Sequence, residues 1–421
     1  MTNSFETRET IDDDEGAFAV EPSPPFKPSP TIHSEMEARW GEPDVFAKTG
    51  MRGLDAMLYG GLRRGECVAI AGSAGHGKSS LAIQLAIEAA RSSGVAIYCT
   101  AEMAPDEILA RAVAREMFTL ANNDGAAWGV GFGEVNRGHH LEGRSITSET
   151  MQTEVLERYR RAKDQLHREV YPRLIVRPLA GGATIADVGD LVQRVRGHLA
   201  FEGLVVLVID PLQRLFASAM GARTGKALEA VNANETERVS AVVQELKALA
   251  DAQNLAAVFT SDTTKASAAG ERTGDGLELR GSYQLAHLAT VILTMRADID
   301  AKELASKSNA LDEETIRRSA PTWWGQRADA VKLGAKYALL HCAKNRNGPP
   351  ASFAMGFIPG AGAFVEGDAS APRTGPSKTK PAKKTKTHAV NVNLGAMESK
   401  RVADAIIAAT KTEAIEETEE P

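Results

Sequence analysis

The chain contains the stretch Gly72-Ser73-Ala74-Gly75-His76-Gly77-Lys78-Ser79, which matches the phosphate-loop pattern G-x-x-x-x-G-K-[ST]. An apolar run, Cys67-Val68-Ala69-Ile70-Ala71, comes directly before it, and residues 79–91 have a helical pattern. Glycines let successive backbone N–H groups point into one concavity, to which the following helix adds its positive end. The strand–loop–helix order therefore predicts a site for the phosphates of a nucleoside triphosphate.

Two side chains of this motif have separate expected tasks. Lys78 is expected to contact the β- and γ-phosphates, and the Ser79 hydroxyl is expected to bind Mg²⁺. The predicted nucleotide-binding residues are Gly72, Ser73, Ala74, Gly75, His76, Gly77, Lys78, Ser79 and Ser80.

Composition narrows the class of protein. The chain has 421 residues, 43% of them hydrophobic, and a net charge of −6, so no global basic field favours nucleic acid. No apolar run approaches the roughly 20 residues that span a bilayer, and the acidic N-terminus does not resemble a secretory signal. The three cysteines form no C-x-x-C pair. We expect a cytoplasmic protein without a membrane segment.

The chain divides into three parts by composition. Residues 1–45 form an acidic and proline-rich arm that we expect to be disordered. Residues 46–367 carry regular patterning and are expected to form one ATPase-sized domain. Residues 368–421 comprise a Lys-rich linker, a short helical segment and an acidic tail. Both tails read as solvated linkers, although the Lys-rich tract could instead contact a nucleic-acid backbone.

Apolar, β-branched runs alternate with amphipathic helical segments in the central part. The expected strands are 67–71, 95–100, 173–178, 204–209, 256–260, 290–295 and 337–343. The expected helices are 79–91, 105–117, 148–169, 185–200 and 235–253. This alternation predicts an α/β fold in which helices cover both faces of a mostly parallel, twisted sheet.

Two of these strands end in an acid. Asp210 follows the run 204–209, at the strand end where ligands bind in a parallel sheet, and is expected to bind Mg²⁺. The alternative is a simple helix cap. Glu102 follows the run 95–100 and is a candidate base for the water that attacks a phosphate. It could equally be a first-turn glutamate stabilised by the helix dipole.

A hairpin with two cations ends the patterned part of the chain. Lys344 and Arg346 precede an Asn-Gly-Pro turn between the apolar runs 337–343 and 352–357. The pair could be an ordinary charged sheet edge. It could also enter a neighbouring subunit's site and stabilise charge at the γ-phosphate, as an arginine finger does.

The order of motifs resembles a known family. Along the chain lie Thr49-Gly50, Leu54-Asp55, Gly60-Gly61-Leu62, the phosphate loop, Glu102-Met103, residues 209–213 (Ile-Asp-Pro-Leu-Gln) and residues 344–349 (Lys-Asn-Arg-Asn-Gly-Pro). Together, over residues 46–367, they resemble the C-terminal motor domain of DnaB-type replicative helicases, which are RecA-like (superfamily 4) ATPases. The resemblance does not include the helical N-terminal domain of those helicases.

This resemblance implies a RecA-like P-loop core that uses ATP and Mg²⁺. By it, Glu102 is the catalytic base, and Lys344 and Arg346 are fingers acting in trans alongside Lys78 and Asp210. It further implies a homo-oligomeric ring, most often of six subunits, that is a DNA-binding helicase of DNA replication. The family places a glutamine where this chain has Ser261 and Asp262, so these are the possible γ-phosphate sensors.

In such a ring, single-stranded DNA would lie against the loops after two of the strands. The candidate contacts are Arg214, Arg223, Lys226, Lys265, Arg272 and Arg280. They could also be ordinary surface residues. The Lys-Asn-Arg motif is similar to that of RadA-type ATPases, and KaiC-like proteins share the core. The sequence therefore also allows a recombination or regulatory ATPase with recombination partners, or a nucleotide-gated scaffold that does not unwind DNA.

Overall fold

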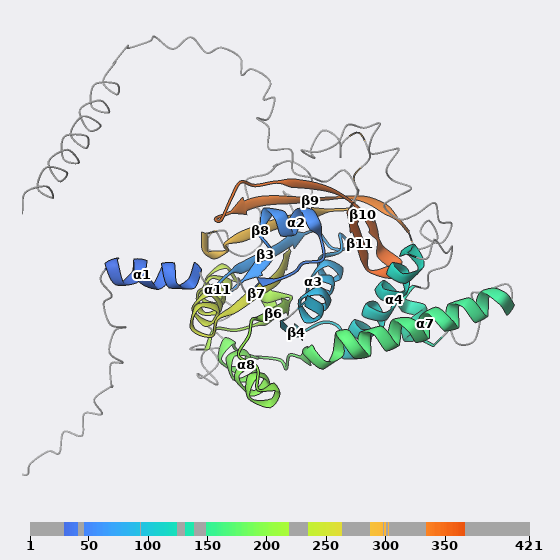
Figure 1. Ribbon diagram of the computed structural model, residues 1–421, viewed down its shortest axis with the longest axis horizontal. Helices are drawn as coiled ribbons and strands as arrows, with labels where there is room; N and C mark the ends of the chain where they lie inside the picture. The colour runs from blue at the N-terminus through green and yellow to red at the C-terminus, as the bar shows by residue number, and fades with distance from the viewer. Residues whose placement is uncertain are drawn as a thin grey trace, which may run out of the picture. The chain divides into compact units, whose positions relative to one another are not determined.

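A nine-stranded sheet forms the centre of the protein. The computed structural model describes residues 29–40, 46–92, 94–123, 131–138, 149–218, 235–262, 287–297, 299, 302 and 334–366. In these ranges the strands are β3 (Cys67–Gly72), β4 (Val95–Thr100), β5 (Leu174–Pro178), β6 (Val205–Asp210), β7 (Leu255–Asp262), β8 (Val291–Arg296), β9 (Lys336–Asn345), β10 (Ser352–Ile358) and β11 (Ala363–Glu366). Their spatial order is β11-β10-β9-β8-β3-β7-β6-β4-β5 (Figure 1).

Strands β3 to β8 pair in parallel, whereas β9, β10 and β11 add antiparallel pairs at one side. The helices are α2 (Arg52–Met57), α3 (Lys78–Ser92), α4 (Pro105–Asn123), α5 (Phe132–Asn136), α7 (Glu149–Glu169), α8 (Ile185–Leu199) and α11 (Glu235–Ala252). A two-stranded sheet joins β1 (Phe46–Ala47) to β2 (Leu62–Arg63). None of the helices in the described ranges is long and apolar enough to cross a membrane.

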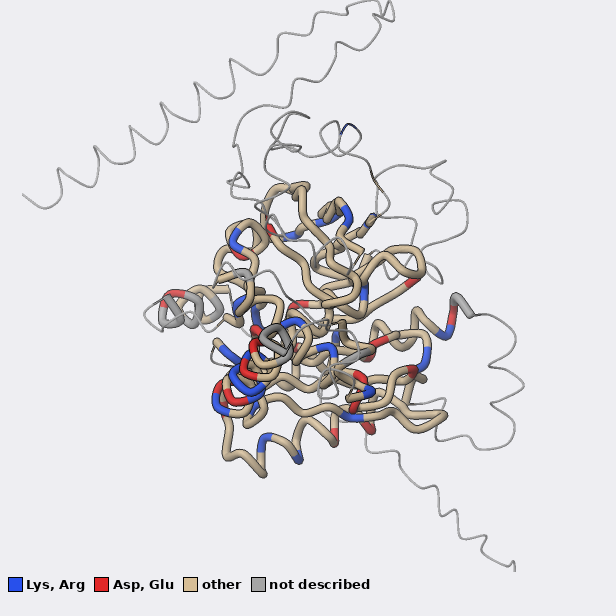
Figure 2. Tube along the Cα trace, turned by 90° about the vertical axis from the view of Figure 1, so that its right-hand side faces the viewer, with Lys and Arg blue, Asp and Glu red and all other residues tan. Residues whose placement is uncertain are grey.

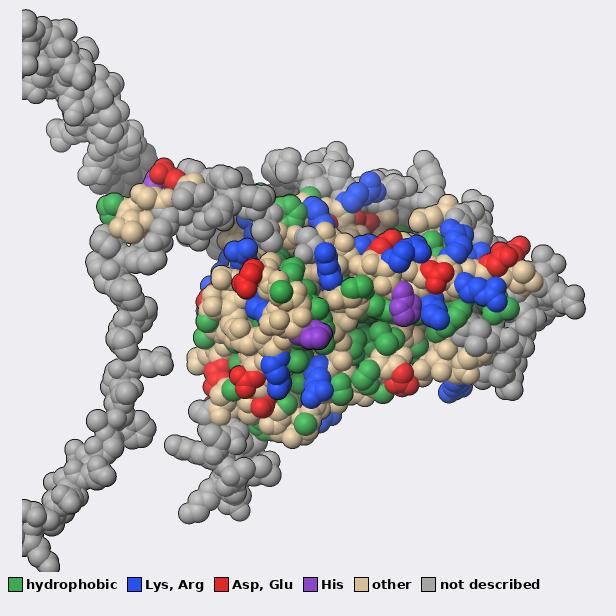
Figure 3. Space-filling model, turned by 60° about the horizontal axis from the view of Figure 1, so that its bottom comes forward, with side chains coloured by type: hydrophobic (Ala, Val, Ile, Leu, Met, Phe, Trp, Pro, Cys, Tyr) green, Lys and Arg blue, Asp and Glu red, His purple; other side chains and the backbone are tan. Residues whose placement is uncertain are grey.

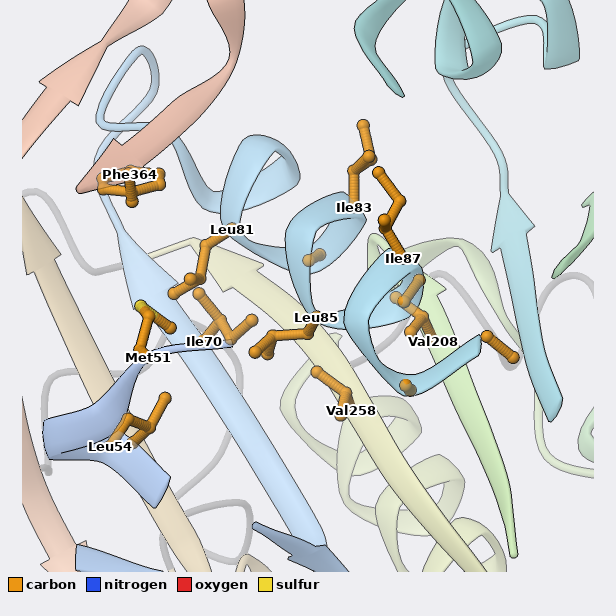
Figure 4. Close-up of a cluster of buried hydrophobic side chains, with 14 of the residues drawn as sticks. Met51, Leu54, Ile70, Leu81, Ile83, Leu85, Ile87, Val208, Val258 and Phe364 are labelled. Atoms are coloured by element: carbon orange, nitrogen blue, oxygen red, sulfur yellow. The ribbon is translucent and has the colours of Figure 1, made fainter. Parts of the chain in front are cut away.

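Alternate residues of β3 enter two separate hydrophobic cores. Val68 and Ile70 join the core that contains Leu81 and Leu85 of α3. Cys67, Ala69 and Ala71 join the core that contains residues of α8 and α11. Side chains of a strand alternate between the faces of a sheet, so both faces are covered by helices. Figure 4 shows Ile70, Leu81 and Leu85 facing one another in the first core. The predicted α/β fold class is confirmed.

The antiparallel strands carry the hairpin that the sequence predicts. Strands β9 and β10 pair with Ser352 opposite His341, and β11 extends the sheet by pairing with β10. The rings of Phe357 on β10 and Phe364 on β11 are stacked with centroids 4.4 Å apart. These rings lie against the phosphate loop, because a side chain at Gly77 would approach both within 3 Å. The hairpin is therefore packed onto the motif that opens the domain.

Helix α1 (Ser29–Trp40) lies in the segment 1–45, where the sequence analysis expects disorder. It begins with Ser29 and Pro30, and proline at the first helical position is favourable because its missing N–H would have no partner there. His33 and Glu37 then contact each other one turn apart, at 3.4 Å. Residues 1–28, 41–45 and 367–421 lie outside the described part, so the remainder of the predicted arm and tail stays a prediction.

Charges of both signs are interspersed over the described chain (Figure 2). The face in Figure 3 likewise carries basic, acidic and hydrophobic side chains next to one another. A mixed surface gives little long-range attraction for a polyanion, so any nucleic-acid contact must be local.

Candidate nucleotide-binding site

The phosphate loop has the conformation that its glycines allow. Strand β3 ends at Gly72, residues 73–77 form the loop, and α3 begins at Lys78. Gly75 and Gly77 have φ angles of +79° and +92°, in the left-handed region that disfavours other residues. A side-chain carbon at Gly75 would meet nothing within 4 Å, whereas at Gly77 the aromatic pair closes the space. The loop is thus open on one side and supported on the other.

Lys78 is held by its own chain. Its ammonium donates to the carbonyl oxygens of Gly72 and Ser73, at 2.8 and 3.1 Å. It also forms an ion pair with Asp262, in which Nζ and Oδ1 are 2.9 Å apart. A lysine has three N–H donors, so every donor has an oxygen acceptor in this structure. A phosphate that binds Lys78 would have to replace at least one of these acceptors.

The strand register explains why Asp262 reaches Lys78. Gly72 of β3 pairs with Asp262 of β7, which places the last residue of one strand beside the start of the phosphate loop. The neighbouring Ser261 accepts a hydrogen bond from the Gln213 side chain at 2.8 Å. Ser261 and Asp262, the possible γ-phosphate sensors, therefore both lie at the mouth of the loop.

Asp210 is held between two hydroxyl groups. It ends β6 and is only 5% exposed. The phenol of Tyr98 on β4 donates to Oδ2 at 2.6 Å, and the hydroxyl of Thr260 on β7 donates to Oδ1. Burial, followed by the charge of Asp210, raises the pKa of Tyr98 well above its usual value, so the phenol keeps its proton. Strands β7 and β6 lie next to β3 in the sheet, which brings Asp210 to the same edge as the phosphate loop.

Glu102 lies in the turn between β4 and α4, at the same edge of the sheet. Its side chain is 56% exposed and forms an ion pair with Arg214, with Oε1 and Nη2 3.3 Å apart. The Ala101 amide before it donates to the carbonyl of Asp210 at 3.1 Å, which ties the ends of β4 and β6 together. Arg214, for which the sequence suggests a DNA contact, thus lies beside the candidate base.

The two candidate fingers lie at the opposite edge of the sheet. Ile292 of β8 pairs with Lys344, and Val291 pairs with Val68, four residues before the phosphate loop begins. At about 3.3 Å per residue, the strand alone separates the two regions by roughly 13 Å. The side chains of Lys344 and Arg346 both donate to the carbonyl of His287, the former at 2.9 Å. Burial, together with the charge of Arg346, lowers the pKa of Lys344.

The residues between the cations are anchored elsewhere. The Asn345 side chain donates to the carbonyl of Met57 at 3.3 Å, and that of Asn347 donates to Glu66 at 2.6 Å. Glu66 is 5% exposed, and burial raises its pKa. The hairpin end is therefore fixed, with its cations away from the phosphate loop of the same chain.

The site fits a magnesium nucleotide. Carboxylate and hydroxyl oxygens suit Mg²⁺, which proteins commonly hold with one or two carboxylates, water and the substrate's phosphates. Asp210 and Ser79 supply such oxygens. Within the described ranges there is no group of three or more His, Cys, Asp or Glu that could hold a metal without a nucleotide. The open space above Gly75 leaves room for the phosphates.

Sequence reasoning did not find every residue of this site. Tyr98, Thr260 and Gln213 became visible only once the strand order was known. A tyrosine inside an otherwise aliphatic buried strand was the available signal, since a buried phenol needs a hydrogen-bond partner. The candidate DNA contacts Arg223, Lys226, Lys265, Arg272 and Arg280 lie outside the described residues.

Comparisons with known proteins agree with this geometry. A family model described as "ATPase: KaiC" matches residues 47–119. Protein RecA of Parvibaculum lavamentivorans is 47% identical over 64 residues, which is 15% of this chain and 18% of that protein. The chain therefore spans less than a fifth of the length of this curated relative.

Two solved structures are similar over most of the chain. The ATPase domain of a DnaB-like helicase, solved on its own, has a TM-score of 0.56 and 18% identity, covering 80% of this chain and 96% of that one. A DnaB-like replicative helicase, solved for its interactions with primase, has a TM-score of 0.56 and 18% identity, covering 79% of this chain and 66% of that one. The expected structural resemblance to DnaB-type ATPase domains is confirmed, and the chain has the RecA-like P-loop ATPase fold.

Proposed function

We propose that the chain is an ATP-hydrolysing subunit of a DnaB-like, ring-forming DNA helicase or translocase that acts in DNA replication. One observation carries the proposal furthest. Lys344 and Arg346 are fixed at the edge of the sheet opposite the phosphate loop of their own chain. Cations placed there can complete a nucleotide site only on another subunit, so the proposed enzyme works as a homo-oligomer, with six subunits as the expected number.

The proposed reaction is hydrolysis of the γ-phosphate. Lys78 and the amides of the phosphate loop bind the phosphates, and Ser79 and Asp210 would hold Mg²⁺, which stabilises the charge that develops on them. Glu102 orients a water and accepts its proton as the water oxygen bonds to the γ-phosphorus. The bond between that phosphorus and the bridging oxygen breaks, and ADP leaves. Arg346 and Lys344 of a neighbour stabilise the transferred phosphoryl group.

Two contacts of the described structure must change for this reaction. Lys78 must exchange Asp262 for phosphate oxygens, and Glu102 must exchange Arg214 for water. Ion pairs with exposed partners are weak, about 0.2–1 kcal/mol, so nucleotide binding can offset both. The proposed state with nucleotide therefore has Asp262 near the γ-phosphate, in the position of a sensor.

Single-stranded DNA is the proposed polymer, and replication proteins are the proposed partners. The solved structures with the same fold include a replicative helicase, which supports this choice. We also propose a reducing, cytoplasmic environment, since Cys67, Cys99 and Cys342 are buried free thiols.

A second candidate function is a RecA- or KaiC-like ATPase in recombination or regulation. The similarity to RecA and the KaiC-type family model, both over short parts of the chain, favour it. A nucleotide-gated scaffold without unwinding is the remaining alternative, and the contact of Asp262 with Lys78 favours slow turnover of that kind.

Steady-state ATP hydrolysis with and without single-stranded DNA, at low and moderate salt, tests the proposal. Stimulation that fades as salt rises is expected, because phosphate contacts release counterions. Displacement of one strand from a forked duplex then separates a helicase from a recombination or regulatory ATPase. A basal rate indifferent to DNA at both salt concentrations would count against a DNA motor.

A further inference from the structure

We infer that Tyr98 is a positioning residue for Asp210, and that its phenol determines how strongly the metal ion contributes to nucleotide binding. This inference rests on the proposed role of Asp210 and deepens it. It concerns a residue that never touches the nucleotide and acts only through the carboxylate.

The register of three strands brings the group together. On β4, Thr100 pairs with Asp210 of β6, so Tyr98, two residues earlier, points to the same face of the sheet as Asp210. On β7, Phe259 pairs with Ile209, so Thr260 lies opposite Asp210. Tyr98 and Thr260 are both 0% exposed. No water can replace either hydroxyl without opening the core.

Each hydroxyl occupies one oxygen of the carboxylate. Tyr98 donates to Oδ2 at 2.6 Å and Thr260 donates to Oδ1, so the carboxylate cannot rotate without losing a hydrogen bond. A hydrogen bond to a charged group contributes about 1.5–3 kcal/mol, which is enough to fix one rotamer. The remaining lone pairs of both oxygens then have set directions, as a metal ligand requires.

The phenol also keeps the carboxylate ionised. A buried acid without partners binds a proton more readily, and a protonated acid is a poor metal ligand. A phenol that retains its own proton is a permanent donor to the ionised form. Loss of partners that orient a metal ligand costs roughly 10- to 100-fold in metal affinity or activity.

The test compares nucleotide affinity with and without metal, using a fluorescent non-hydrolysable ATP analogue on the full chain. The ratio of its dissociation constants in EDTA and in saturating Mn²⁺ measures the metal's contribution separately from the phosphate loop. In Tyr98→Phe this ratio should fall about 10- to 100-fold, while the constant in EDTA stays unchanged. Tyr171→Phe, which alters a tyrosine outside the nucleotide site, is the matched control and should leave both constants unchanged.

Asp210→Asn separates failure of the inference from failure of the proposed function. If that variant keeps the wild-type ratio, Asp210 does not hold the metal and the proposed site is wrong. If Asp210→Asn lowers the ratio and Tyr98→Phe does not, only the role of Tyr98 is overturned. A rise of both constants in Tyr98→Phe would mean general loosening and would also overturn it. Should Tyr98→Phe not fold, Thr260→Val tests the same arrangement from the other oxygen.

Discussion

The ammonium of Lys78 lies 2.9 Å from the carboxylate of Asp262, in a direct ion pair at the mouth of the phosphate loop. The chain thus presents a negative group to the lysine that its own sequence motif reserves for a phosphate. This contact makes nucleotide binding a competition between two anions, one of them part of the protein.

Replacing Asp262 by asparagine should strengthen nucleotide binding. The substitution removes the competing charge and its repulsion of the γ-phosphate, and one exposed ion pair is worth up to about 1 kcal/mol, or roughly fivefold in affinity. Titration with a fluorescent ATP analogue at fixed Mg²⁺ measures the change. Lys78→Ala, in which binding should be lost, is the control. Weaker binding by Asp262→Asn would instead mean that this carboxylate helps to hold the magnesium nucleotide.

Glu102→Gln should bind nucleotide normally and hydrolyse it about 10²- to 10⁴-fold more slowly, because the amide cannot accept the proton of the attacking water. A matched substitution is available on the next helix, where Glu107 caps the Ala104 amide at 3.3 Å. Glu107→Gln should retain turnover. Single-turnover hydrolysis measures both variants, and a normal rate in Glu102→Gln would show that another group is the base.

Arg346→Ala should lose turnover while still binding nucleotide, since the proposed finger serves a neighbour. Lys78→Ala should be inactive for a different reason. A mixture of the two proteins should regain part of the activity, because some interfaces then pair an intact phosphate loop with an intact finger. Lys336→Ala, at the other end of β9, is the control for loss of a cation and should stay active. A mixture as inactive as its components would contradict action in trans.

The three thiols should be unreactive in the native protein. Burial raises the pKa of Cys67 and Cys99 to about 12 and that of Cys342 to about 11. The thiolate is the reactive form, so at pH 8 no more than about one thiol in a thousand is ionised. Raising the pH from 7 to 9 should therefore add little labelling by a disulfide reagent. Unfolding in guanidinium should release all three thiols, and fast native labelling at pH 8 would show that a thiol is accessible.

The sequence predicted the strands, the long helices and the phosphate loop because those features depend on local patterns. Strand β4 begins and ends where the apolar run does, at Val95 and Thr100. The contact of Tyr98 with Asp210 could not be predicted, because it depends on β4 lying next to β6, and strand order does not follow from periodicity. The ion pair of Lys78 with Asp262 likewise depends on the register between β3 and β7. Local patterns supply the chemical groups, and the sheet decides which of them meet.

The hairpin of β9 and β10 has a mechanical consequence. One end carries Lys344 and Arg346, and the strand that returns from that end carries Phe357 to the underside of Gly77. In a ring of the proposed kind, one rigid element would touch a neighbour's γ-phosphate at its tip and support its own subunit's phosphate loop at its base. Such an element acts as a lever, so that each subunit would sense whether the next has hydrolysed its nucleotide before it binds its own.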